Sequence, residues 1–224
     1  IKKALSGSHL SNSDRLINYF RWINRRDLEK LYTSDFKEEL RGSNAEQPML
    51  DFIQDLPKKT SRIDKVLTLE QRFFLTDHNL IYTDKMSMKA GVEVRVPFLD
   101  LDLVNYVSSL PDSFKQRSRE GKWILKKIME QYLPKKIIYR SKSGFGVPLK
   151  SWLRNELKDW INEILSKNRL QKRGLFNPMA VEQLINENLT GQTDSSYTIL
   201  SLVCIELWCE QFLHKDKNEV KLKY

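Results

Sequence analysis

A glycine loop beside one lysine is the segment of this sequence best suited to chemistry. In Arg140-Ser-Lys-Ser-Gly-Phe-Gly-Val-Pro148, the ammonium group of Lys142 stands next to two glycines. Gly144 and Gly146 permit backbone angles and close approaches that side chains forbid, and Pro148 stiffens the exit. A phosphate or another anion could therefore approach the backbone here. A glycine turn that ends in proline is also an ordinary connecting turn, so the loop alone leaves both interpretations open.

Two earlier segments place charged side chains within apolar sequence. Tyr82-Thr-Asp-Lys-Met-Ser-Met88 carries Asp84, and Glu93-Val-Arg-Val-Pro-Phe-Leu-Asp100 carries Glu93 and Arg95 two residues apart. Each has a structural alternative, with Asp84 as a surface charge and Glu93 with Arg95 as an ion pair. The order and spacing of all three segments together make them one combined candidate site.

The composition indicates a basic globular protein without a membrane segment. The chain has 224 residues, 40% of them hydrophobic, which is enough to bury a substantial core. No run approaches the roughly 18 apolar residues of a membrane helix, and the opening residues lack the apolar stretch of a secretory signal. We therefore expect a cytoplasmic protein. The net charge of +9 suits anionic partners, but bases and acids are mixed along the chain, as on an ordinary solvated surface.

The cysteines and histidines predict no structural metal site. Cys204 and Cys209 are five residues apart in a predicted helix, so their side chains point to different faces and are poorly placed for a disulfide. We expect both to be small core residues. The three histidines, at positions 9, 78 and 214, lack the spacing of metal ligands.

Helical spacing of apolar residues dominates the chain and predicts a mainly α fold. Helices are expected over about 13–23, 34–40, 64–89, 101–110, 120–132, 152–164, 178–189 and 195–213, with an extended piece at 92–96. Leu67, Phe74 and Ile81 are one heptad apart, and Leu69, Phe73 and Leu80 widen the same stripe. The 64–89 helix should therefore lie against the core for much of its length. The 101–110 helix should bury Leu103, Val104 and Val107, and the 120–132 helix should turn Trp123, Ile124 and Ile128 inward. The final helix is apolar around most of its surface and should be central and buried. We expect one body over 1–213, followed by a charged tail over 214–224.

The predicted ends of these helices carry recognisable capping residues. Ser13, Asp100 and Asn177 are expected to cap the starts of the first helix, the 101–110 helix and the 178–189 helix. Gly91 and Gly191 are expected to end the helices that precede them.

Taken in order, the motifs resemble those of the glutamine-dependent asparagine synthetases and their amidotransferase relatives. Asp84-Lys-Met-Ser-Met-Lys-Ala-Gly-Val-Glu-Val-Arg-Val-Pro-Phe-Leu-Asp100 is similar to the family signature Asp-Arg-x-Ser-Met-x-x-x-x-Glu-x-Arg-Val-Pro-Phe-Leu-Asp. The same family order then continues through Glu120-Gly-Lys-Trp-Ile-Leu-Lys126, Leu133-Pro134, the Lys142 loop, Trp152-Leu153, Leu175-Phe-Asn-Pro178 and Glu206-Leu-Trp208. The resemblance covers nearly the whole chain.

The resemblance implies the helical C-terminal portion of an α/β, adenine-nucleotide-hydrolase-like synthetase domain of the ATP pyrophosphatase type. In the complete enzyme, ATP with Mg²⁺ would adenylate the side-chain carboxylate of aspartate, and glutamine-derived ammonia would then displace AMP. Lys142 matches the family lysine that contacts the phosphates, and Ser143 and Gly144 would add hydroxyl and amide contacts.

The other motif residues receive less specific roles from the resemblance. Asp84 falls where an acid helps to shape the site. Arg95 would orient a carboxylate or tie its loop to the core, and Glu93 would either pair with it structurally or organise the site. Lys85 occupies a position where arginine is common in the family signature. A lysine ammonium cannot make the two-pronged contact that an arginine guanidinium would make there.

Several family segments do not occur in this sequence, which leaves alternatives open. They are the N-terminal glutaminase region with its nucleophilic cysteine, the Ser-Gly-Gly-x-Asp-Ser pyrophosphate loop and the Gly-x-Asp-Glu-x-x-Gly-Gly-Tyr segment. The resemblance thus implies a fragment that alone lacks glutaminase activity and binds ATP weakly. The alternatives are an amidotransferase acting on another carboxylate, such as one in a polysaccharide or peptide, a noncatalytic scaffold, and a basic module for nucleic acid or an acidic partner. The resemblance argues against nucleic acid and leaves oligomerisation open.

Overall fold

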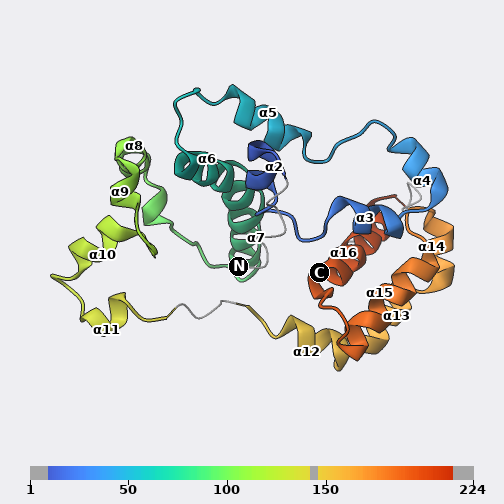
Figure 1. The fold of residues 1–224 in the computed structure, drawn as a ribbon. Helices are drawn as coiled ribbons and strands as arrows, with labels where there is room; N and C mark the ends of the chain where they lie inside the picture. The colour runs from blue at the N-terminus through green and yellow to red at the C-terminus, as the bar shows by residue number, and fades with distance from the viewer. Residues whose placement is uncertain (1–9, 142–145, 214–224) are drawn as a thin grey trace. The chain divides into compact units, whose positions relative to one another are not determined.

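The computed structural model describes residues 10–141 and 146–213, and helices make up most of them. The chain divides into two compact units (Figure 1). Unit 1 comprises Ile1–Phe20 and Asn44–Ser143, and unit 2 comprises Arg21–Ser43 and Gly144–Tyr224. The prediction of a mainly α fold is confirmed. No helix in the described ranges is long and apolar enough to cross a membrane.

Unit 1 is a series of helices with one small hairpin. Its elements are α2 (Asn12–Ile17), α5 (Gln47–Asp55), α6 (Arg62–Leu69), the π-helix η1 (Glu70–Leu80), α7 (Ile81–Lys89), the 3-10 turn η2 (Pro97–Leu99), α8 (Leu101–Ser109), α9 (Asp112–Lys115), strands β1 (Gln116–Arg117) and β2 (Glu120–Gly121), α10 (Trp123–Met129) and α11 (Lys135–Ile138). The two strands pair antiparallel, Gln116 opposite Gly121 and Arg117 opposite Glu120.

The predicted long helix is present as α6, η1 and α7, which follow one another without interruption from Arg62 to Lys89. Ser61 caps its start, because its hydroxyl oxygen accepts a hydrogen bond from the backbone N–H of Asp64 at 3.0 Å. The same hydroxyl donates to Asp112 at 2.9 Å, and Lys115 Nζ lies 2.6 Å from the Asp64 carboxylate. These contacts fix the start of α6 to α9.

The predicted apolar stripe of this long helix is buried only in part, through Leu69 and Phe73. The core of unit 1 consists of Leu16, Ile17, Ile53 and Leu69, whereas Leu67, Phe74 and Ile81 are 41%, 36% and 46% exposed. Residues seven apart lie on one face of a helix only while each turn holds about 3.6 residues. The i→i+5 turns of the π-helix hold more residues, so Phe74 and Ile81 do not continue the face that Leu67 begins. Among the described elements, α5 packs against α6 on the side of Leu69.

The region expected to begin a helix at residue 120 begins instead with the hairpin. Ser118 and Lys122 adopt left-handed backbone angles, with φ of 55° and 56°, so the helix starts only at Trp123. The Arg117 guanidinium lies 5.0 Å from the centre of the Trp123 ring, and the Phe114 ring meets the same tryptophan edge-on. Cation–π and ring contacts therefore favour the hairpin.

Side chains expected to be buried on α8 and α10 are also more exposed than predicted. Leu103 and Val107 on α8 are 39% and 36% exposed, and Ile128 on α10 is 51% exposed. An apolar stripe predicts which face of a helix can be buried, but burial itself requires another element against that face.

Unit 2 contains α3 (Arg25–Leu31), α4 (Ser34–Glu39), α12 (Leu149–Arg154), α13 (Lys158–Ile164), α14 (Lys167–Arg173), α15 (Pro178–Thr190) and α16 (Ser196–Leu213). The helix predicted over 152–164 is two helices, because the chain leaves helical geometry at Asn155, where φ is −119° and ψ is −84°. A single bridge joins Tyr32 to Phe176 and ties the α3–α4 connection to the start of α15.

The core of unit 2 is larger and gathers side chains from most of its helices. Its buried members are Leu31, Leu149, Leu153, Ile161, Ile164, Leu165, Leu170, Phe176, Val181, Ile185, Ile199, Leu202 and Val203. Helix α16 contributes one face to this core, against α12, α13 and α15. Its other apolar side chains, Ile205, Trp208 and Phe212, are 39–60% exposed. The prediction that the final helix is central and buried is therefore confirmed for one face of α16 only.

Most predicted helix ends are confirmed. Asp100 and Asn177 cap α8 and α15 with side-chain oxygens, and Gly91 and Gly191 end α7 and α15 with φ of 69° and 81°. The cap of the first helix is Ser11 rather than Ser13, because the Ser11 hydroxyl is the group that accepts from Asp14 N. Cys209 is buried as predicted, whereas Cys204 is exposed.

Candidate functional site

The predicted phosphate-contacting residues Lys142, Ser143 and Gly144 lie outside the described residues. Their roles therefore stay predictions. The described chain reaches the loop through Tyr139, which caps the C-terminal end of α11, and leaves it through Pro148, which precedes α12.

Asp84 lies in the first turn of α7 and is exposed. Its backbone carbonyl accepts a hydrogen bond from the Ser87 hydroxyl at 3.0 Å. Within the part of the chain that the structure describes, its carboxylate contacts no other side chain through a hydrogen bond or ion pair. A surface acid of this kind contributes little to folding, so it is available to a ligand or to another protein segment.

The segment with Glu93 and Arg95 leaves α7 through a tight reversal at Gly91. The N–H of Gly91 donates to Met88 O at 3.0 Å and the N–H of Val92 donates to Ser87 O at 2.9 Å. The positive φ of Gly91 makes this reversal possible, since other residues rarely adopt that angle. The chain then continues to Pro97 without regular secondary structure, so no strand forms at the extended piece predicted over 92–96.

Glu93 and Arg95 form the ion pair that the sequence allowed. Arg95 Nη2 lies 2.8 Å from Glu93 Oε1, and the two side chains are 84% and 69% exposed, respectively. An ion pair this exposed contributes about 0–1 kcal/mol to stability. The pair orients the guanidinium without burying it, and the remaining Arg95 donors stay accessible.

The structure brings Glu93 and Arg95 together but does not join Asp84 to them. Asp84 lies on α7, before the Gly91 reversal, and the ion pair lies after it. No hydrogen bond or ion pair among the described residues links the two. A site shared by Asp84 and Arg95 would therefore need a bound ligand, or residues that the structure does not describe, to connect them.

A polar network that sequence reasoning missed lies at the entrance to the Lys142 loop. The Tyr139 hydroxyl donates a short hydrogen bond to Glu130 Oε1, and Lys127 Nζ lies 3.0 Å from the same oxygen. Lys126 Nζ lies 5.3 Å from the centre of the Tyr139 ring and 2.8 Å from Glu120 Oε1. The network joins β2, α10 and the end of α11.

The charges of this network shift the pKa of its members. The hydrogen bond to the Glu130 carboxylate raises the pKa of Tyr139 to about 12, because losing the proton would leave two anions in contact. The same hydrogen bond, followed by that of Lys127, lowers the pKa of Glu130. The only sequence signal for this arrangement is a group of acids and lysines shortly before an aromatic residue, and the nine-residue separation of Glu130 and Tyr139 fits no helical spacing.

Unit 2 contains a buried ion pair with a structural role. Arg173 Nε lies 3.2 Å from Glu206 Oε2, and the two side chains are 11% and 3% exposed. The other carboxylate oxygen, Glu206 Oε1, is buried without a hydrogen-bond partner in the described chain. The pair connects α14 to α16. Loss of either partner would leave the other as an unpaired buried charge.

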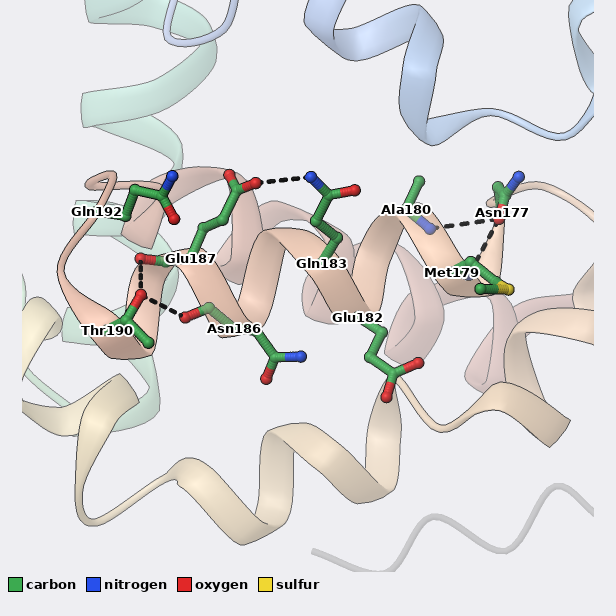
Figure 2. Close-up of a pocket in the computed structure, with 9 residues that line it drawn as sticks. All are labelled: Asn177, Met179, Ala180, Glu182, Gln183, Asn186, Glu187, Thr190 and Gln192. Atoms are coloured by element: carbon green, nitrogen blue, oxygen red, sulfur yellow. Dashed lines mark hydrogen bonds between the residues drawn. The ribbon is translucent and has the colours of Figure 1, made fainter.

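An open groove of about 710 Å³ runs along α15 (Figure 2). Its lining is mostly polar and consists of Asn177, Met179, Ala180, Glu182, Gln183, Asn186, Glu187, Thr190 and Gln192. Gln183 donates to Glu187 at 2.7 Å and the Asn177 side chain caps the helix, so these groups satisfy one another. The groove contains none of the predicted site residues and no cationic group for an anion.

The described residues do not form a metal site by themselves. Over 10–141 and 146–213, no three His, Cys, Asp or Glu side chains come close enough together to hold a metal ion.

Comparisons with known proteins agree on one family. A family model described as asparagine synthase matches residues 4–210. The chain is 30% identical over 148 residues to asparagine synthetase (glutamine-hydrolyzing) 1 of Bacillus subtilis (strain 168), which covers 66% of this chain and 23% of that protein. It is 31% identical over 165 residues to asparagine synthetase (glutamine-hydrolyzing) 3 of the same organism. That match covers 73% of this chain and 25% of that protein.

A more distant relative carries a different name. The chain is 29% identical over 115 residues to the amidase chyE of Penicillium rubens, covering 49% of this chain and 17% of that protein. No solved structure matches. The chain spans about a quarter of the length of the curated synthetases it matches.

Proposed function

Because the chain belongs to the asparagine synthase family, we propose that it carries the phosphate-contacting side of an ATP-dependent synthetase site. The observation that carries the proposal is the order of its motifs. The Asp84–Asp100 signature is followed by the Lys142 loop, and both lie inside the region that the family model matches. The proposed reaction joins ammonia to a carboxylate, with the side chain of aspartate as the acceptor.

The proposed chemistry has two steps. A carboxylate oxygen attacks the α-phosphorus of ATP, which forms an acyl-adenylate and releases pyrophosphate. Ammonia then attacks the acyl carbon, and AMP leaves with the bonding electrons of the acyl–oxygen bond. Catalysis of the first step requires alignment of the two reactants and stabilisation of the charge that builds up on the phosphates.

Lys142 supplies the cation for the first step. A compact ammonium on a flexible four-carbon side chain can follow negative charge as pyrophosphate departs. Ser143 and Gly144 add a hydroxyl and a backbone N–H to the same phosphates. Arg95, oriented by Glu93 at 2.8 Å, is proposed to position a carboxylate, and Asp84 to shape the site.

Other parts of the synthetase would complete the site. The curated relatives are about four times longer than their matched segment, which leaves room for a glutaminase that supplies ammonia and for a region that cradles ATP. Under this proposal the chain is the helical C-terminal portion of an adenine-nucleotide-hydrolase-like domain in a cytoplasmic enzyme. Mg²⁺ would arrive with the ATP phosphates.

Replacement of Lys142 tests this function. In the complete synthetase, Lys142→Ala should lower aspartate-dependent pyrophosphate release by on the order of a hundredfold to a thousandfold, as loss of an electrostatic donor commonly does. Glutamine hydrolysis should persist. Lys136→Ala is the matched control, because Lys136 is an exposed lysine on the neighbouring helix α11. Unchanged pyrophosphate release in Lys142→Ala would contradict the assignment.

A second candidate function follows from the similarity to an amidase. An amidotransferase with the same adenylation step could act on the carboxylate of a peptide or polysaccharide instead of aspartate. Pyrophosphate release measured with a panel of carboxylates separates the two. Release that depends on aspartate alone supports the asparagine synthetase, and release with another carboxylate but not with aspartate supports the alternative.

A further inference from the structure

We propose that residues 92–96 pair along one edge with a β-strand from another part of the complete synthetase. The inference rests on the proposed function, because it names the partner of the segment that carries Arg95. The observation that carries it is a strand-like sequence whose central backbone groups have no hydrogen-bond partner in the described chain and whose valines are exposed.

The sequence of this segment alternates as a half-buried strand does. Val92, Val94 and Val96 alternate with Glu93 and Arg95, and successive side chains of a strand point to opposite faces. The ion pair fits that geometry, since Arg95 Nη2 lies 2.8 Å from Glu93 Oε1 across a two-residue separation. β-branched residues at every second position also favour a strand. One face of the segment is therefore apolar and the other is charged.

The backbone of the segment is open to pairing. Among the described residues, no backbone N–H or C=O group of residues 93–95 takes part in a hydrogen bond. Hydrogen bonds occur only at the two ends, where the N–H of Val92 donates to Ser87 O and the N–H of Leu99 donates to Val96 O, both at 2.9 Å. A row of free N–H and C=O groups is a template for another strand.

Both ends of the segment are fixed before any partner arrives. Gly91 reverses the chain after α7 with φ of 69°, and the 3-10 turn η2 begins at Pro97. Asp100 then caps α8 by accepting a hydrogen bond from Leu103 N at 3.0 Å. A segment held at both ends loses less conformational freedom on pairing, which favours binding.

The valine face has no cover in the part of the chain that the structure describes. Val92, Val94 and Val96 are 55%, 45% and 45% exposed, and Phe98 and Leu101 are 66% and 77% exposed. A contiguous group of exposed apolar side chains marks a surface that contacts another protein segment. Covering this face removes apolar surface from water and stabilises the pairing.

The partner is another part of the same synthetase. Residues 92–96 lie inside the region that the asparagine synthase model matches. The chain spans about a quarter of the length of the curated synthetases, so most of such an enzyme remains to supply the strand. Pairing through the backbone and the valine face leaves the opposite face, with Glu93 and Arg95, open to a carboxylate.

Amide hydrogen exchange in the complete synthetase, read residue by residue by mass spectrometry, tests the pairing. Successive N–H groups of a strand point to opposite edges, so one paired edge protects alternate amides. We expect the amides of either residues 93 and 95 or residues 94 and 96 to exchange at least about tenfold more slowly than the other two. In the 224-residue chain by itself, all four should exchange rapidly. Equal rates for the four amides in the complete synthetase would overturn the inference.

Substitution of Val94 tests the apolar face. Val94→Asp places a charge on that face and should abolish the protection, whereas Val94→Thr keeps the β-branched shape and should retain it. Met179→Asp is the matched control and should leave the protection unchanged, because Met179 belongs to unit 2 and is 71% exposed. Protection that survives Val94→Asp would overturn the role of the valine face. If Val94→Asp does not fold, the exchange pattern of the unmodified synthetase decides the question.

Dilution identifies the source of the strand. Protection within one synthetase chain should not depend on protein concentration, whereas protection that falls on dilution would assign the strand to a second copy and overturn the inference. Hydrogen exchange requires no catalysis, so its outcome is separate from that of the proposed function. If Lys142→Ala leaves pyrophosphate release unchanged while alternate amides are protected, only the proposed function fails. If release falls as expected and the amides are unprotected, only the strand pairing fails.

Discussion

Individual residues in this protein acquire their properties from close charged neighbours more than from burial. Tyr139 is 38% exposed, yet its pKa is raised to about 12 because its hydroxyl donates to a carboxylate. Arg95 is more exposed still, but Glu93 fixes its direction at 2.8 Å. In both cases the partner is a carboxylate within hydrogen-bonding distance.

The pKa shifts define the pH range over which the Tyr139–Glu130 contact is complete. The pKa of Tyr139 is raised from 10.0, so its contribution to stability is present below pH 10 and is lost as the pH rises towards about 12. The pKa of Glu130 is lowered from 4.5, so its contribution is present above that value and is lost as the pH falls through the lower folded pKa. The contact is therefore complete across the physiological range.

Substitution of Glu130 should release Tyr139 from its high pKa. Glu130→Gln keeps a side-chain carbonyl that can accept the hydroxyl proton, but it removes the negative charge that opposes ionisation. We expect the pKa of Tyr139 to move from about 12 towards its ordinary value of about 10. The chemical shift of the Tyr139 ring, followed against pH by nuclear magnetic resonance and assigned with Tyr139→Phe, measures the change. An unmoved pKa would mean that Glu130 is not the cause.

At the scale of elements, a helical sequence pattern correctly identified the long helix but only part of its buried face. Residues 62–89 are helical throughout, and Leu69 rather than Leu67 enters the core. The π-helix η1 follows Leu69, and its i→i+5 hydrogen bonds change the number of residues per turn before Phe74 and Ile81 are reached. Contact with α5 decides which side of α6 is buried.

Alanine substitutions on α6 test which face is buried. Leu69 is 0% exposed and Leu67 is 41% exposed, and both are leucines on the same short helix. Leu69→Ala should lower the free energy of unfolding by about 2–5 kcal/mol, whereas Leu67→Ala should change it by about 0.5 kcal/mol or less. Urea denaturation of the two variants measures both values. Equal losses of unfolding free energy would mean that Leu67 is buried as well as Leu69.

At the scale of the whole molecule, many basic side chains are paired with acids, and the net charge of +9 is the excess of bases that remains. Arg25 with Glu29, Lys30 with Asp27 and Arg41 with Glu38 are examples of bases held by acids on the same helix. Local pairing leaves a smaller field at a distance than a cluster of unpaired bases would produce.

Binding to nucleic acid can be measured directly. We expect the chain to show no retention on duplex DNA or on RNA at about 150 mM salt, because nonspecific binding through scattered phosphate contacts weakens steeply as salt rises. Measurement over a series of salt concentrations gives the slope. Tight binding with a steep slope that persists at this salt concentration would favour a nucleic-acid module.

The sequence by itself determined the family motifs, the helical class and most helix ends. These features are local, since a capping hydrogen bond or a left-handed glycine depends on residues within one turn. Asp100, Asn177, Gly91 and Gly191 therefore act where the sequence predicts. The predicted roles of Lys142, Ser143 and Gly144 rest on sequence alone.

Tertiary structure alone decided which faces are buried and which distant side chains meet. Burial of Leu69 requires α5 to pack against α6, and exposure of Trp208 follows from packing on only one side of α16. The contact of Tyr139 with Glu130 requires α11 to fold back on α10. Such contacts depend on the path of the chain between elements, which local residue spacing does not encode.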